Sequence, residues 1–210
     1  MKKIYIGAIV AVLLTTLSIS TLAYKLSNTK TIYAIDNTSV TSLTTEYDWV
    51  TYKNLKDLVT NSDLIIMGDV ISDNKPSKKE MKIILPSDID ENLKQKILSD
   101  AKNTIVTESE VSVRKTLKGK SKSNIIKIEQ PGGTLEGFFS KVSGVNYFKK
   151  GQKAIFFLLK AEGGDLYLTL NPFQGHIFTV DGKIKPDADN KFFIRDSSED
   201  DVLKEIENSK

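Results

Sequence analysis

Cysteine and histidine, two residue types that commonly carry out chemistry, are almost absent from this chain of 210 residues. It contains no cysteine, which excludes disulfides, thiolate metal sites and a cysteine nucleophile. Its single histidine, His176, cannot by itself form a multi-histidine zinc site. His176 could act as a general base, but no catalytic partner is recognisable near it in the sequence, and we interpret it as a strand-start residue beside a turn. We therefore predict no cofactor, no metal site and no assigned catalytic residue.

Serine, lysine and carboxylate residues are abundant enough to leave one enzymatic alternative open. No Ser-x-x-Lys segment comes with the accompanying signatures of the hydrolases that use it. Asp and Glu residues are scattered over strand exteriors and the C-terminal segment, so no catalytic pair is recognisable. An envelope hydrolase with a carboxylate or Ser–Lys site stays an alternative, and a purely structural envelope protein is another.

A basic turn over residues 114–122 is the first candidate binding segment. Clustered cations of this kind suit anionic lipid headgroups or cell-wall polymers. The competing interpretation is a solvated hairpin tip. The cationic residues of this turn are Arg114, Lys115, Lys118, Lys120 and Lys122.

An aromatic loop over residues 131–148 is the second candidate. It begins with the chain-breaking Pro131-Gly132-Gly133 segment. Exposed aromatic side chains on loops often anchor binding partners, although they also fold back to close the end of a barrel. The four aromatic residues concerned are Phe138, Phe139, Tyr147 and Phe148.

The N-terminus has the pattern of an export signal. Lys2 and Lys3 precede an almost uninterrupted apolar run over residues 4–17, and Thr21 and Ala23 are small residues suited to cleavage before Tyr24. An uncleaved anchor over residues 4–24 is the alternative, because that length can span a bilayer. Both interpretations predict a secreted or cell-surface protein, membrane-tethered if the leader is not cleaved.

The charge balance narrows the class of partner. Without Lys2 and Lys3 the chain holds 28 basic and 27 acidic residues, which is not the charge of a nucleic-acid-binding protein. A composition rich in Lys, Ile and Asn resembles that of low-GC, Gram-positive bacteria. We predict a non-enzymatic binding module of the cell envelope, whose partner is an extracellular protein or an anionic envelope polymer.

Short strands dominate the rest of the sequence. Residues 64–71 are apolar at both parities, which predicts a strand buried on both faces. Over residues 107–117, strict alternation predicts that Val111, Val113 and Leu117 share one face. Further strands are predicted over residues 124–130, 154–159 and 166–170, followed by a hairpin across Asp181-Gly182.

Helical patterns are few and do not alternate with the strands, which disfavours a parallel α/β fold. Apolar spacing predicts helices over residues 90–101 and 197–207, the second with Ser198 as its N-cap, while residues 75–79 suggest a solvated loop. The predicted fold is mainly β: a small closed or partly open antiparallel barrel (OB-like) with a helical insertion and a short C-terminal helix. The predicted organisation is a leader (1–23), a polar linker (24–52), a barrel domain (53–195) with insertion 73–103, and an acidic C-terminal helix (196–210).

The order of the core segments is similar to that of a known superfamily. A strand over residues 62–70 is followed by a strand that ends in Leu117-Lys118-Gly119, then by Ile126-Lys127-Ile128, and then by Gly151 and a hydrophobic strand. Over about residues 57–180 this resembles the netrin-module and tissue-inhibitor-of-metalloproteinase type of OB-fold barrel. Inhibitors of that family chelate the catalytic zinc of the protease through an N-terminal cysteine, which this chain lacks. The resemblance therefore implies a fold and transfers no functional residue.

Overall fold

The computed structural model describes residues 30–36, 39–46, 49–79, 95, 104–161, 165–186, 190 and 197–210. The predicted leader over residues 1–23 lies outside the described residues, and so does most of the predicted helix over 90–101. Contacts divide the chain into two units. Unit 1 comprises Met1–Trp49, Pro76–Val106 and Pro131–Ser143, and unit 2 comprises Val50–Lys75, Thr107–Gln130 and Gly144–Lys210.

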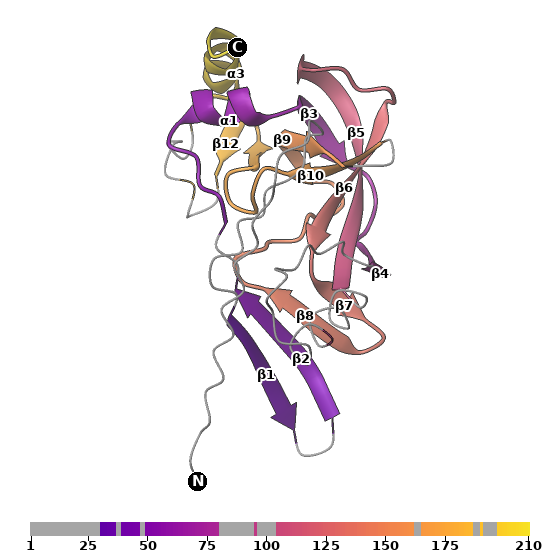
Figure 1. Cartoon of the computed structure of the whole chain (residues 1–210). Coiled ribbons are helices and arrows are strands. Elements are labelled where there is room, and N and C mark those ends of the chain that lie inside the picture. Colours follow the sequence, from indigo (N-terminus) through magenta and orange to yellow (C-terminus); the bar gives the residue numbers. More distant parts are fainter. Residues whose placement is uncertain are drawn as a thin grey trace. The chain divides into compact units, whose positions relative to one another are not determined.

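A closed five-stranded barrel forms the centre of unit 2 (Figure 1). Neighbouring strands follow the order β10-β6-β5-β3-β9, and a further pairing of β10 with β9 closes the circle. This confirms the predicted small barrel and is compatible with an OB-like fold. The barrel is mixed and not wholly antiparallel as predicted, since β10 pairs with β6 in parallel. Its strands are β3 (Leu64–Val70), β5 (Thr104–Lys118), β6 (Ile125–Pro131), β9 (Lys153–Lys160) and β10 (Leu166–Thr169).

Two apolar cores lie on opposite faces of β3 and β9, as the double-sided hydrophobicity of residues 64–71 predicted. Along β3, Leu64 and Ile66 face an inner core inside the barrel, whereas Ile65 and Met67 face an outer core. The inner core consists of Leu64, Ile66, Val70, Val111, Ile126, Ile128, Phe148, Ala154, Phe156, Leu158 and Tyr167. The outer core consists of Leu55, Leu58, Val59, Ile65, Met67, Leu117, Ile155, Phe157, Leu170, Ile177, Ile184, Val202 and Ile206.

The predicted common face of Val111, Val113 and Leu117 is wrong. Val111 and Val113 belong with the inner core, but Leu117 packs in the outer core. The pairing of β3 with β5 shifts register between Ile65 and Ile66 and again between Met67 and Gly68. A bulge inserts an extra residue and so breaks the period-two alternation on which the prediction relied.

Two helices cover the outer core. Helix α1 (Leu55–Asn61) begins at Asn54, whose side chain accepts a hydrogen bond from the Asp57 backbone N–H at 2.9 Å. Helix α3 (Glu199–Asn208) begins at Ser198, which confirms the predicted C-terminal helix and its N-cap. Figure 1 shows α1 and α3 next to each other. Their buried side chains, Leu55, Leu58, Val59, Val202 and Ile206, are part of the outer core.

A hairpin extends the sheet beyond the barrel strand β9. It joins β11 (His176–Val180) to β12 (Lys183–Lys185) through Asp181 and Gly182, both with positive φ. Positive φ at both turn residues is the geometry that favours an Asp-Gly pair, so the predicted hairpin is confirmed.

Unit 1 contains a separate four-stranded sheet in the order β1-β2-β8-β7. Strands β1 (Lys30–Asp36) and β2 (Ser39–Glu46) lie within the segment predicted as a polar linker. Strand β2 pairs in parallel with β8, about a hundred residues away in sequence. The linker interpretation overlooked these strands because their partner is distant and local apolar periodicity is weak. The remaining strands of this sheet are β7 (Gly133–Leu135) and β8 (Phe138–Val142).

Strand β4 (Lys75–Lys79) corrects the loop predicted for the same residues, because it pairs with β5. Its composition of lysines and Pro76 is typical of an edge strand, where these residue types hinder pairing with other chains. Among the described residues, no helix combines the length and the hydrophobicity needed to cross a membrane.

Candidate binding surfaces

The predicted basic turn forms the end of β5 and its connection to β6 (Figure 1), a segment that we call the basic hairpin (residues 114–125). Its cations are not equivalent. Arg114 forms an ion pair with Asp69 on the neighbouring strand β3, with 3.3 Å between Nε and Oδ2. This ion pair engages the guanidinium of Arg114 within the fold.

Lys118 serves the fold directly. Its Nζ donates hydrogen bonds to the backbone carbonyls of Val59 at 2.6 Å and Thr60 at 3.1 Å. These carbonyls lie in the last turn of α1, where helix C=O groups lack intrahelical partners and the helix dipole favours a cation. Lys118 therefore caps α1 and is not available to the predicted binding surface in the way that an exposed lysine is.

Lys115, Lys120 and Lys122 are exposed. Within the described part of the chain, none of the three forms an ion pair or a side-chain hydrogen bond. The connection that carries Lys120 and Lys122 is ordered by the two serines that alternate with them, Ser121 and Ser123. Ser121 Oγ donates to the Ser123 carbonyl at 2.6 Å, and Ser123 Oγ accepts from the Ile125 N–H at 3.1 Å.

A glycine holds the basic hairpin close to the start of β3. Gly119 has a φ of +78°, and a Cβ at this position would overlap the backbone carbonyl oxygen of Asp63. The Asp63 side chain is itself engaged, since its Oδ2 accepts the Lys160 N–H at 2.9 Å. The turn is thus fixed against the barrel while the ammonium groups of its lysines reach solvent.

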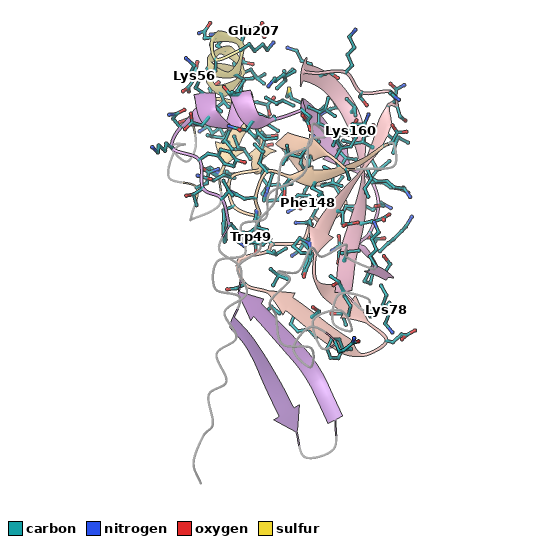
Figure 2. The ribbon with its side chains drawn as sticks, viewed as in Figure 1. Trp49, Lys56, Lys78, Phe148, Lys160 and Glu207 are labelled. Atoms are coloured by element: carbon teal, nitrogen blue, oxygen red, sulfur yellow. The ribbon has the colours of Figure 1, made fainter. Side chains whose placement is uncertain are left out.

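The aromatic loop does not form one surface. Phe148 has no exposed area and lies in the inner core (Figure 2), with its ring centroid 5.3 Å from that of Phe156 and 5.0 Å from that of His176. Gln130 anchors it, because its Oε1 accepts the Phe148 N–H at 3.0 Å while its Nε2 donates to the Asn146 carbonyl at 2.9 Å. The structure thus assigns Phe148 to the barrel core, in line with the alternative that the loop closes a barrel end.

Tyr147, the neighbour of Phe148, is half-buried. Burial raises the pKa of its phenol to about 12, because desolvation disfavours the phenolate. Deprotonation of Tyr147 therefore requires a higher pH in the folded protein than that of an ordinary tyrosine.

Phe138 and Phe139 lie on β8, which belongs to unit 1, whereas the basic hairpin belongs to unit 2. Phe139 is 38% exposed. Phe138 lines a pocket of about 230 Å³ together with Lys78, Ile105, Leu135 and Glu136. Lys78 Nζ and Glu136 Oε2 are 3.5 Å apart, and Figure 2 labels Lys78 in this unit. The pocket combines apolar side chains with one ion pair.

His176 is fully buried as the first residue of β11, with ring contacts to Phe148 and, at 4.7 Å between centroids, to Phe178. This agrees with the strand-start interpretation. Within the described ranges, no three His, Asp or Glu residues form a group that could hold a metal ion.

Asn171 and Gln174 form a polar network that the sequence analysis did not single out. Gln174 Oε1 accepts the Tyr52 N–H at 2.9 Å, and Gln174 Nε2 donates to the Tyr52 carbonyl at 3.0 Å. Asn171 Nδ2 donates to the Val50 carbonyl and to Gln174 Oε1, both at 2.8 Å. Both amides are buried and hold the chain segment that enters α1. The Asn-Pro-x-x-Gly spacing, typical of a side-chain-stabilised turn, was the available signal.

Comparison with known proteins assigns no relative: no protein-family model matches the chain, and no curated protein matches it significantly.

Proposed function

We propose that this protein is an exported, non-enzymatic binding module of a bacterial cell envelope, and that the basic hairpin is its main contact surface. The leader pattern over residues 1–23 supports export. The protein is secreted or at the cell surface, and residues 4–24 tether it to the membrane if the leader is retained. The small barrel of unit 2 supports a binding role, because OB-like barrels commonly bind through loops and one sheet face.

One observation carries the proposal: Lys115, Lys120 and Lys122 are exposed on an ordered hairpin and are not engaged by any described acidic side chain. Neighbouring like charges repel one another and so contribute no stability to the hairpin. Because the backbone of the hairpin is ordered before any contact, less entropy is lost when it binds an anionic partner.

Unit 1 offers a second contact area for a protein partner. Phe139 is the exposed aromatic residue of β8, and Phe138 lies in the adjoining pocket. Aromatic side chains are frequent anchors in protein interfaces. We assign these two residues a supporting role, since one exposed ring is common on protein surfaces.

We further propose a distant relation to the netrin-module and tissue-inhibitor-of-metalloproteinase barrels. The segments that carry the resemblance correspond to β3, β5, β6 and β9, which are four of the five barrel strands. Because the cysteine on which protease inhibition depends is absent, this relation concerns the barrel and not its activity.

Affinity capture from envelope extract tests the binding function, with the exported protein as purified from cells as bait. We expect the wild type to retain a specific envelope component and the K115Q/K120Q/K122Q variant to retain much less. A K53Q/K56Q/K204Q variant is the matched control, because it removes three exposed lysines, from the residue before the N-cap of α1, from α1 and from α3. Equal capture by all three proteins would contradict the assignment of the surface, and no capture by the wild type would contradict the function.

Mass spectrometry of the exported protein tests the proposed localisation and the fate of the leader. We expect a mature N-terminus at Tyr24 if the leader is cleaved, or an intact N-terminal segment in the membrane fraction if it anchors the chain. Recovery of the native protein from the cytosol would contradict export.

A further inference from the structure

We propose that the basic hairpin recognises a linear, soluble polyanion with closely spaced charges, rather than a single anion or a lipid surface. This inference rests on the proposed binding function and specifies its ligand class.

The hairpin region has more positive charges than are engaged in ion pairs or hydrogen bonds within the described fold. Residues 111–128 contain six Lys or Arg and no Asp or Glu. Arg114 is engaged by Asp69, Lys118 by the end of α1, and Lys127 by Glu108 at 3.6 Å between Nζ and Oε2. Lys115, Lys120 and Lys122 are left exposed, which makes this surface locally cationic although the exported chain is nearly neutral.

The type of cation indicates what is recognised. The three exposed residues are lysines, whose ammonium groups act as hydrated point charges. The one arginine of the hairpin, which could grip a phosphate or carboxylate in bidentate fashion, is engaged with Asp69. Such a surface responds to charge density along a ligand and binds an isolated phosphate weakly.

The tip of the hairpin disfavours a lipid surface. Residues 119–124 are Gly, Lys, Ser, Lys, Ser and Asn, so the tip has no apolar side chain to insert among lipids. The half-exposed Ile125 lies at the start of β6, after the tip. Each lysine near an anionic bilayer contributes only about 1 kcal/mol, so three lysines alone bind a membrane weakly.

Rigidity favours an extended ligand. Lys120 and Lys122 alternate with serines whose hydroxyls are hydrogen-bonded within the turn, and Val113 N–H donates to the Asn124 carbonyl at 2.8 Å. The tip thus carries two exposed lysines two residues apart on a turn whose backbone is ordered. Closely spaced anionic groups on a flexible chain can adapt to that spacing and release counterions as they bind.

The test measures binding of the exported protein to linear polyphosphate over a series of salt concentrations. We expect log affinity to fall with log salt with a slope of about −2, since three lysines each contribute about −0.7 on a single-stranded polyanion. K120Q/K122Q should lower the affinity at low salt by at least about tenfold. It should also reduce the magnitude of the slope from about 2 to below about 1. K56Q/K204Q should leave both quantities unchanged.

Inorganic phosphate and anionic vesicles are two further probes, which distinguish a linear polyanion from a free anion and from a lipid surface. Inorganic phosphate at the same total phosphate concentration should not compete with polyphosphate, and vesicles containing an anionic lipid should bind more weakly at equal accessible charge. The inference is overturned if polyphosphate does not bind, if K120Q/K122Q binds it normally, if phosphate competes equally, or if vesicles bind as tightly. Envelope capture that persists after such a result would leave the proposed function standing and reject only the ligand class.

Discussion

Two polar regions of unit 2 differ in what their side chains contact. In the loop over residues 171–175, the amides of Asn171 and Gln174 are buried, and they form hydrogen bonds with each other, with Val50 and Tyr52 and with the backbone of the loop itself. On the basic hairpin, Lys115, Lys120 and Lys122 reach solvent and contact none of the described acidic side chains. The polar side chains of the loop form hydrogen bonds that hold the chain in place, whereas the three lysines of the hairpin stay exposed on an ordered backbone.

This difference separates stability from recognition. Buried polar groups that lose a partner cost free energy, because water cannot replace the lost hydrogen bond. Exposed lysines are solvated whether or not a ligand is present, so their removal affects the fold little. Residues of the first kind should therefore be sensitive in unfolding experiments, and residues of the second kind only in binding experiments.

The largest effect on the free energy of unfolding is expected from Phe148, the loop residue that is buried in the inner core. Phe148→Ala should lower the free energy of unfolding by about 3–5 kcal/mol, because it removes a fully buried ring from the inner core. Phe139→Ala on β8 is the matched control and should cost less than about 1 kcal/mol, since Phe139 is partly exposed. Urea unfolding measures both. Similar values for the two variants would contradict the placement of Phe148.

The buried amide of Gln174 should come next. Gln174→Ala leaves the Tyr52 N–H and carbonyl and one Asn171 donor without a protein partner, and we expect a loss of about 2–3 kcal/mol in unfolding free energy. Hydrogen exchange of the Tyr52 amide should accelerate in the variant. An unchanged exchange rate would show that the amide contact does not hold this segment.

Lys118 stabilises the fold, whereas Lys120 on the same hairpin is exposed. Lys118→Met keeps most of the aliphatic stem but removes the ammonium that caps the Val59 and Thr60 carbonyls, so we expect a loss of about 1–2 kcal/mol in unfolding free energy. Lys120→Met removes a charge from the same hairpin and should cost less than about 0.5 kcal/mol. A larger loss for Lys120→Met would reverse the distinction.

The smallest effect is expected from Tyr147 at high pH. Its folded pKa of about 12 exceeds the ordinary value of 10.0, so the folded protein retains the phenolic proton more tightly than the unfolded chain. The associated stability is complete below pH 10 and is lost as the pH rises towards 12. Tyr147→Phe should flatten the decline in unfolding free energy over that window, and an identical decline in both proteins would contradict the raised pKa.

Local patterns in the sequence predicted the barrel well because most of its strands are marked by apolar periodicity or tight turns. The Asp181-Gly182 hairpin and the Ser198 N-cap followed from local chemistry alone. The face of Leu117 could not be predicted, because a bulge between paired strands is invisible to an alternation rule. Strands β1 and β2 were missed because the strand that pairs with β2 lies far along the chain.

The candidate site shows the same limit. The run of cations at residues 114–122 was visible in the sequence, but their division was not. Asp69 lies 45 positions before Arg114, and the carbonyl that accepts from Lys118 lies 59 positions before it. Likewise, the aromatic residues of the loop were visible, but only the folded chain shows that Gln130 directs Phe148 inward while Phe139 stays partly exposed.

The most direct measurement compares K115Q/K120Q/K122Q with the wild-type protein in urea unfolding. We expect the free energy of unfolding to change by less than about 0.5 kcal/mol, or to rise slightly as repulsion is relieved, because no described contact of the fold uses these three ammonium groups. A loss of more than about 1 kcal/mol would mean that the lysines serve the fold, and it would contradict their assignment to a partner.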